Sequence, residues 1–495
     1  MPIAATRLPI ANVITIALRV RAYSGSRSTV RGVQRSPRSP HFPVCELVRT
    51  HRRGLRHPAA GLGSTVLQHE HAKYQAFSHF EHADRGSIDD VSGHGDAQEG
   101  VGARVAQLRK LGGLTQQRLA DRAHISVGLI RSVEQGRVPA TPAFLGAVSK
   151  ALRTSVADLT GQPYVPATGP DTEVHAAITV LRTELAAYDL DNTDIRDTRP
   201  MPRISEEVNQ ICRYRRNASF HHLGEELPPL LGEVRAIVHR TTGEVRDRAL
   251  VMMCELYYSA HSLAHKLGYA DLAALAVDRI AWAARESGNQ LWTATSQFQR
   301  AALLTSGGEW TAALNFLERC RSDIEPRLDV GRRSDLIAWG GLHLQSGLAA
   351  SRAGKRDVAD AHLAEARETA ARVGDDRDPI LSFGPTNVDI WSVALAVEAM
   401  DGTEALNRAQ SLVIAAGTSK ERAGHHFIDL SRAYLLHGDR RQAFGALQKA
   451  RMITPTQTRY NPMVHETVRA LARAEARSVD TVHGFAVWCG IADRL

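Results

Sequence analysis

A chain of 495 residues is too long for one ordinary hydrophobic core, so about two to four domains are expected. Hydrophobic residues make up 43% of the chain and aromatic residues only 5%, a balance typical of Leu- and Ala-rich helical arrays that favours an all-α fold. The net charge is +8, the five cysteines include no CxxC pair, and no stretch approaches the ~20 apolar residues of a membrane-spanning helix, which argues against metal-ribbon, disulfide-framework and membrane classes.

The first 99 residues carry no sustained helical or strand period. Residues 1–60 hold eleven Arg, no Lys and a single acidic residue, whereas residues 61–100 hold seven acidic and two basic residues. Such patternless polarity predicts a disordered leader. Two interpretations stay open, a basic arm that binds phosphates and an open reading frame extended upstream of its true start, since no Met lies between Met1 and Met201.

An export signal is not expected at the start of the chain. The apolar run Ile10–Leu18 is short and leads into Arg19 and Arg21. With its unpaired cysteines and no membrane span, the chain is expected to be a cytoplasmic protein.

The next segment, residues 100–162, is both basic and patterned. Nine basic and three acidic residues lie between 101 and 164, and the hydrophobic period divides the segment into five short helices. A compact basic domain of this kind indicates contact with phosphates. Glycines and prolines cluster in the linker expected at 163–171, and residues 172–495 follow with Ala/Leu-rich helical periods and no alternating strand pattern.

A specific motif lies inside the five predicted helices. Its residues are Thr115, Gln116, Leu119, Ala120, Ile125, Ser126, Ile130, Val133, Glu134 and Gly136. Thr115 and Ser126 are suited to cap helices, Ala120 permits two helices to cross closely, and the large apolar residues suit a miniature core. The motif resembles the Cro-repressor (XRE) helix-turn-helix over about 60 residues, which implies a five-helix Cro/repressor-like domain that binds double-stranded DNA.

The helix that begins after Ser126 is the expected reading helix. Ile130 and Val133 point one way at 100° per residue, and the opposite face is expected to read bases through Ser126, Val127, Gly128, Arg131 and Ser132. Phosphate contacts are expected from Gln116, Arg109, Lys110, Arg118 and Arg137. The alternative for Arg131 and Ser132 is an ordinary solvated helix face.

Two positions depart from the pattern usual in this family. His124 occupies a turn position where Gly is common, and histidine tolerates the left-handed backbone that the turn requires. Val127 and Gly128 replace the polar side chains usual at reading positions, so the operator sequence cannot be derived.

The C-terminal part contains a repeat. Its anchor residues are Phe427, Leu430, Tyr434, Gly438, Ala443, Leu447, Ala450 and Pro455, and two further blocks keep the register around Gly354 and Gly308. This spacing resembles a tetratricopeptide repeat, with turns spaced more widely than the ideal ~34 residues. Residues 172–495 are therefore expected to form a tetratricopeptide-like α-solenoid, which suits either a peptide or small-molecule effector or simple homodimerisation.

The order of these parts resembles actinobacterial XRE-type regulators with tetratricopeptide-like C-terminal domains. The resemblance implies a dimeric transcriptional regulator acting in the cytoplasm on the nucleoid. Two alternatives are an interaction scaffold localised by its helix-turn-helix and an antitoxin-like autorepressor. No cofactor, metal or catalytic residue is expected: His261 and His265 stand four apart as zinc ligands can, but HSLAH lacks the glutamate of HExxH and no third ligand is evident.

Overall fold

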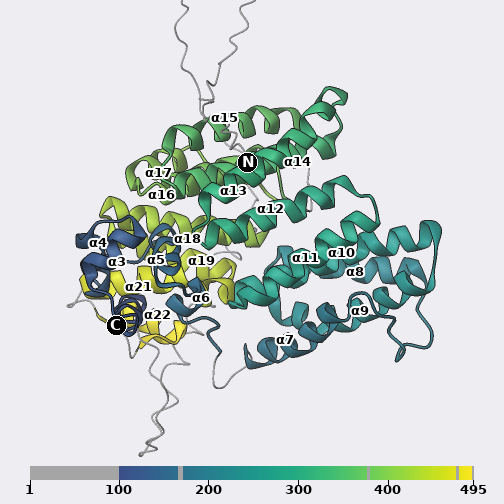
Figure 1. Ribbon diagram of the computed structural model, residues 1–495, viewed down its shortest axis with the longest axis horizontal. Helices are drawn as coiled ribbons and strands as arrows, with labels where there is room; N and C mark the ends of the chain where they lie inside the picture. Colours follow the sequence, from purple (N-terminus) through teal and green to yellow (C-terminus); the bar gives the residue numbers. More distant parts are fainter. Residues whose placement is uncertain (1–99, 166–170, 376–379, 475–478, 493–495) are drawn as a thin grey trace, which may run out of the picture. The chain divides into compact units, whose positions relative to one another are not determined.

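The computed structural model describes residues 100–165, 171–375, 380–474 and 479–492 (Figure 1). Every regular element in these ranges is a helix, so the all-α prediction is confirmed. No helix among these residues combines the length and apolar character needed to cross a lipid bilayer. The expected disordered leader, residues 1–99, lies outside the described residues, and so do residues 166–170 of the expected linker.

The first five helices of the described chain form what we call the five-helix domain. They are α2 (Val101–Leu111), α3 (Gln116–Ala123), α4 (Val127–Glu134), α5 (Pro142–Leu152) and α6 (Val156–Thr160). Side-chain oxygens cap four of the helix starts, because each accepts a hydrogen bond from the first turn of its helix: Thr115, Ser126, Thr141 and Ser155. Both caps predicted from the motif are therefore present. The sequence thus encodes where these helices begin.

The α3–α4 turn has the geometry that the motif requires. His124 adopts the left-handed backbone expected of it, with φ 54°. Leu119, Ala120, Ile130 and Val133 are buried in the core of the domain, while Ile125 is half-buried against it. The predicted miniature core therefore forms, with Phe144, Leu145, Val148 and Leu159 among its further members.

The rest of the described chain consists of helices α7–α22, which we call the helical array. They are α7 (Asp171–Ala186), α8 (Met201–Arg216), α9 (Phe220–Arg240), α10 (Gly243–Leu267), α11 (Ala270–Glu286), α12 (Gln290–Ser306), α13 (Trp310–Ile324), α14 (Arg333–Arg352), α15 (Arg356–Val373), α16 (Pro385–Glu398), α17 (Gly402–Ala409), α18 (Lys420–His437), α19 (Arg440–Ile453), α20 (Pro455–Arg459), α21 (Pro462–Ala474) and α22 (Val479–Cys489), with a 3₁₀ turn at Glu325–Val330.

Successive helices of the array pack in pairs, as the repeat predicts. The three predicted blocks correspond to the pairs α12–α13, α14–α15 and α18–α19. Their turns contain Gly308, Gly354 and Gly438, each with positive φ, and the small residues Ala443 and Ala450 are fully buried between paired helices. The spacing of 84 residues between Gly354 and Gly438, twice 42, contains a further pair, α16–α17.

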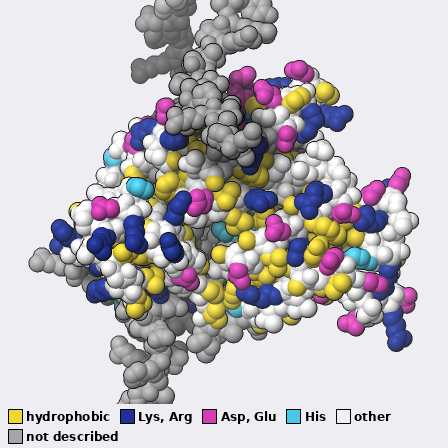
Figure 2. Space-filling view, in the orientation of Figure 1, with side chains coloured by type: hydrophobic (Ala, Val, Ile, Leu, Met, Phe, Trp, Pro, Cys, Tyr) yellow, Lys and Arg dark blue, Asp and Glu magenta, His cyan; other side chains and the backbone are white. Residues whose placement is uncertain are grey.

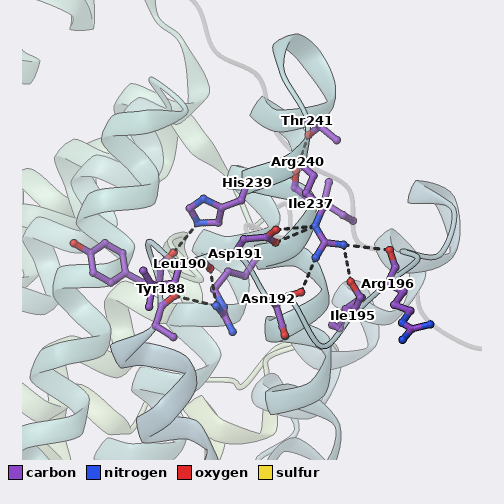
Figure 3. A network of polar contacts seen from close by, with 12 residues as sticks. Tyr188, Leu190, Asp191, Asn192, Ile195, Arg196, Ile237, His239, Arg240 and Thr241 are labelled. Carbon is purple, nitrogen blue, oxygen red and sulfur yellow. Dashed lines mark hydrogen bonds and ion pairs between the residues drawn. The ribbon is translucent and has the colours of Figure 1, made fainter.

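An arginine side chain holds the connection between α7 and α8. Between α7 and α8 the chain has no regular structure near Asp191–Arg196, and its carbonyl groups lack helical partners. Arg240 of α9 donates to both carboxylate oxygens of Asp191, at 2.9 and 3.0 Å, and to the carbonyls of Asn192 and Ile195, at 2.7 and 2.6 Å (Figure 3). This arginine supplies the donors that a helix would otherwise provide.

Distant parts of the array also meet through charged groups. Helix α18 packs against α8, and Lys266 at the end of α10 pairs with Glu421 of α18 at 2.7 Å in a largely buried position. Glu398 at the end of α16 accepts from Arg352 at 2.7 Å and from Arg432 at 2.8 Å. Although burial alone would raise the pKa of Glu398, the two guanidinium groups hold it at about 2.

The five-helix domain packs directly against the array. Gly146 of α5 lies so close to the α12–α13 turn that a Cβ added to it would stand 2.9 Å from the Cα of Gly308. Lys150, also in α5, pairs with Glu309 at 2.8 Å. The ring of Tyr164 packs against His465 of α21 in a tilted arrangement, with 4.5 Å between ring centroids. The segment after α6 was expected to be a linker, but Tyr164 within it is a packed residue.

Buried histidines in the array predict loss of stability in acid. Burial lowers the pKa of His261 and of His426 to about 4. Above pH 6.5 both rings are neutral in the folded and unfolded chains. Between pH 6.5 and about 4 only the unfolded chain takes up these protons, so each ring lowers the free energy of unfolding by up to about 1.4 kcal/mol per pH unit as the pH falls.

Urea unfolding at pH 7.5, 6.0 and 5.0 measures this slope. His261→Gln should make the slope shallower, whereas His437→Gln, at an exposed position of α18, should leave it as it is. An unchanged slope in His261→Gln would contradict the assignment.

Candidate nucleic-acid interface

The outward face of α4 collects the residues expected to read bases. Ser126, Gly128 and Arg131 are exposed, and Val127 and Ser132 are half-buried. Val127 packs partly against the domain core, so less of its side chain is available to a ligand than the sequence suggested. Among the described residues, Arg131 has no carboxylate partner, and its guanidinium donors face solvent.

The inward end of α4 carries a carboxylate that accepts hydrogen bonds from three donor groups. Arg109 of α2 donates through Nε to Oε1 of Glu134 at 2.6 Å and through Nη2 to Oε2 at 2.9 Å. Gln116 at the start of α3 donates through Nε2 to the same Oε2 at 2.8 Å. Three helices therefore converge on the Glu134 carboxylate. Although burial alone would raise the pKa of Glu134, these hydrogen bonds hold it below its ordinary value.

Arg109 was expected to contact phosphate, but the structure places it in the interior. It is buried, and its remaining Nη1 donor is taken up by the carbonyl of Leu114 at 2.8 Å. It follows Val101 and Val105 at four-residue spacing on the buried face of α2, and this spacing is the sequence signal that points to its burial. Arg109 is a positioning residue that orients α4 and Gln116.

The other expected phosphate-binding residues are differently placed. Lys110, Arg118 and Arg137 are exposed, and Gln116 is half-buried at the N-terminus of α3. Thr115 caps that helix by accepting from the N–H of Arg118 at 3.1 Å, which leaves the first amides of α3 directed outward. Figure 2 shows Lys and Arg side chains gathered on the surface over the five-helix domain. A surface with these features is suited to bind a polyanion.

Sequence reasoning did not find the residues of α21 that reach this domain. Glu466 accepts a hydrogen bond from the N–H of Ala140 at 3.1 Å, and Arg473 donates through Nη1 to the carbonyl of Gly136. Met463 packs against the core of the five-helix domain. More than 300 residues of sequence separate the partners, and no local pattern predicts such contacts.

The histidine pair singled out in the array has no metal-ligand geometry. His261 and His265 stack at 5.7 Å between ring centroids, and Nδ1 of His261 lies 3.1 Å from the carbonyl of Ala273. No group of three or more His, Cys, Asp or Glu side chains within the described ranges is arranged to hold a metal ion.

Comparison with known proteins identifies the five-helix domain. A family model described as a helix-turn-helix domain matches residues 101–160. The crystal structure of Bacillus thuringiensis PlcR in complex with the peptide PapR7 and DNA is similar at 13% identity and a TM-score of 0.20, over 55% of this chain and 95% of that chain. No curated protein matches the chain. The family match assigns a helix-turn-helix DNA-binding domain to residues 101–160, and paired helices follow it.

Substitution of Glu134 tests whether its carboxylate stabilises the five-helix domain. Glu134→Ala leaves the buried Arg109 guanidinium without its partner, which costs about 3–5 kcal/mol. Amide hydrogen exchange across residues 101–160 should rise accordingly in the full-length chain.

Asp121→Ala is the matched control, because Asp121 is an exposed carboxylate bonded only to Gln117 at 2.8 Å. The double change Arg109→Met with Glu134→Leu should recover much of the protection. If Arg109→Ala instead left exchange unchanged and lowered only DNA affinity, Arg109 would be a phosphate contact after all.

Proposed function

We propose that this chain, whose residues 101–160 form a helix-turn-helix DNA-binding domain, is a sequence-specific transcriptional regulator of double-stranded DNA. The observation that supports specificity is the outward face of α4, where Ser126, Gly128 and Arg131 are exposed together. Arg131 favours the O6 and N7 edge of guanine, and Val127 offers a methyl surface to thymine. Gln116, Lys110, Arg118 and Arg137 flank this face as phosphate contacts. We place its action in the cytoplasm, on the nucleoid.

We also propose that the regulator binds as a homodimer. One helix-turn-helix reads only a few base pairs and buries about 600–1,000 Å² of protein surface, too little for tight specific binding. The apolar residues of the five-helix domain are largely used in its own core and against α21. Dimerisation is therefore assigned to the helical array, whose paired helices suit it.

A sensing role for the array is supported by its charged interior. Lys266 pairs with Glu421 between helices 155 residues apart, and Glu398 binds Arg352 and Arg432 where α14, α16 and α18 meet. Burying ion pairs costs several kcal/mol of desolvation per ion, and packing alone is achieved as well by apolar residues. The charges favour a polar effector, either a peptide or a small molecule, over a purely structural role for the array.

Binding-site selection tests the reading face. Arg131→Ala should lower discrimination at one base position by about 1–3 kcal/mol, because a bidentate base contact is lost. Lys110→Ala should weaken binding to all sequences alike, because it removes a phosphate contact.

Arg248→Ala is the control, since Arg248 is an exposed arginine of α10 in the array. Uniform losses for Arg131→Ala across all sequences would remove it from base reading. Failure of the wild-type chain to select any sequence would favour the scaffold alternative.

Dimeric binding predicts a symmetric operator. Selected sites should be inverted repeats whose half-sites lie about 34 Å apart, one turn of DNA, because a two-fold dimer presents two copies of α4. Sedimentation of the full-length chain should give twice its mass of 54.1 kDa. A monomer that protects a single half-site would contradict this proposal.

A further inference from the structure

Helix α21 brings an arginine to the end of the reading helix. Gly136 lies two residues after the end of α4, in the turn that leads to α5, with φ 69°. The Arg473 side chain lies against this glycine and donates through Nη1 to its carbonyl oxygen. Arg473 is exposed, and a guanidinium carries five N–H donors, so one bond to a carbonyl fixes its orientation and leaves other donors directed to solvent.

The position of Arg473 is set by buried contacts of the same helix. Glu466 accepts from the N–H of Ala140 at 3.1 Å and pairs with Arg469 at 2.9 Å, and both side chains are buried. One helical turn earlier, Met463 packs against the core of the five-helix domain. Arg473 is therefore held on the turn between α4 and α5 by a built interface and is not a loose surface side chain.

Several basic side chains lie around this turn. Arg137 is the next residue after Gly136 and is exposed, and Arg131 lies within α4 on the exposed face. The acidic residue nearest to Arg131 and Arg137 in the sequence, Glu134, is taken up by Arg109 and Gln116 in the interior. Within the described part of the chain, no carboxylate pairs with Arg131, Arg137 or Arg473. Like charges that gather without a protein counter-ion favour a polyanionic ligand.

The dimensions of α4 place this turn over a DNA backbone. With a rise of 1.5 Å per residue, the distance from Val127 to Gly136 along the helix direction is about 13 Å. The major groove is about 12 Å wide. When the N-terminal residues of α4 reach base edges, as in helix-turn-helix docking, the turn after its C-terminus lies near the phosphates at the edge of the groove.

We propose that Arg473 is a phosphate-binding residue of the DNA interface, so that the end of the helical array contributes directly to DNA binding beside Arg137. This inference rests on the proposed DNA-binding function. The array thereby does more than assemble the dimer: α21 supplies a charge that the five-helix domain alone does not contain.

Titration of full-length variants with cognate and random DNA across a salt series tests this role. One phosphate contact contributes about 0.9 to the slope of log affinity against log salt, which corresponds to about fivefold in affinity near 0.15 M salt. Arg473→Ala should lower affinity for both DNAs by that factor and reduce the slope by about 0.9. Arg473→Lys should keep the slope, because it keeps the charge.

Two further variants separate the outcomes. Arg137→Ala is the reference for a phosphate contact within the five-helix domain, and Arg248→Ala is the control for an array arginine outside α21. An unchanged slope in Arg473→Ala, with Arg137→Ala and Arg131→Ala impaired, would overturn the inference and leave the proposed function standing. A rise in affinity in Arg473→Ala would also overturn it, since α21 would then compete with DNA. Unimpaired binding in all of these variants would instead reject the proposed function.

Discussion

The orientation of α4 depends on one buried carboxylate. Glu134 lies in α4, and its hydrogen bonds come from Arg109 in α2 and Gln116 in α3. A buried charge without partners costs several kcal/mol, so α4 cannot rotate or slide without losing donors that nothing else replaces. The outward direction of Arg131 follows from this constraint, because fixing the rotation of α4 at Glu134 also fixes the direction of the other side chains that the helix carries. A polar contact in the interior thus determines which side chains the surface presents.

Local signals in the sequence were sufficient to predict the elements of the five-helix domain. Thr115 and Ser126 act as caps, His124 takes the left-handed turn, and Leu119 and Ile130 are buried, because each of these properties depends on neighbours a few residues away. Arg109 shows the limit of this reasoning. Its four-residue spacing from Val101 and Val105 places it on the buried face of α2, but only the approach of Glu134, 25 residues later, supplies the carboxylate that a buried guanidinium requires.

In the array too, the sequence predicted local features such as turns, but not which distant helices pack together. Gly308, Gly354 and Gly438 mark turns, since positive φ is available to glycine at little cost. The contacts Lys266–Glu421 and Ala140–Glu466 join segments that are 155 and 326 residues apart, and no periodicity encodes which helices meet there. The expected linker was inferred from Gly and Pro content alone, which reports the end of a helix and says nothing of what Tyr164 packs against.

Contacts between the five-helix domain and the array come from separate parts of the array. Gly146 and Lys150 of α5 meet the α12–α13 turn, whereas the turn after α4 meets α21. A compact domain can keep its contacts with separate parts of the array only while the distances between those parts stay constant. Since packed interfaces switch between discrete arrangements and do not stretch continuously, a change of curvature between α12 and α21 must break one contact or rotate the domain. If the array senses an effector, as we propose, an effector that binds one array conformation more tightly than another would act on the direction of α4 through these contacts, with its differential affinity as the limit of the effect.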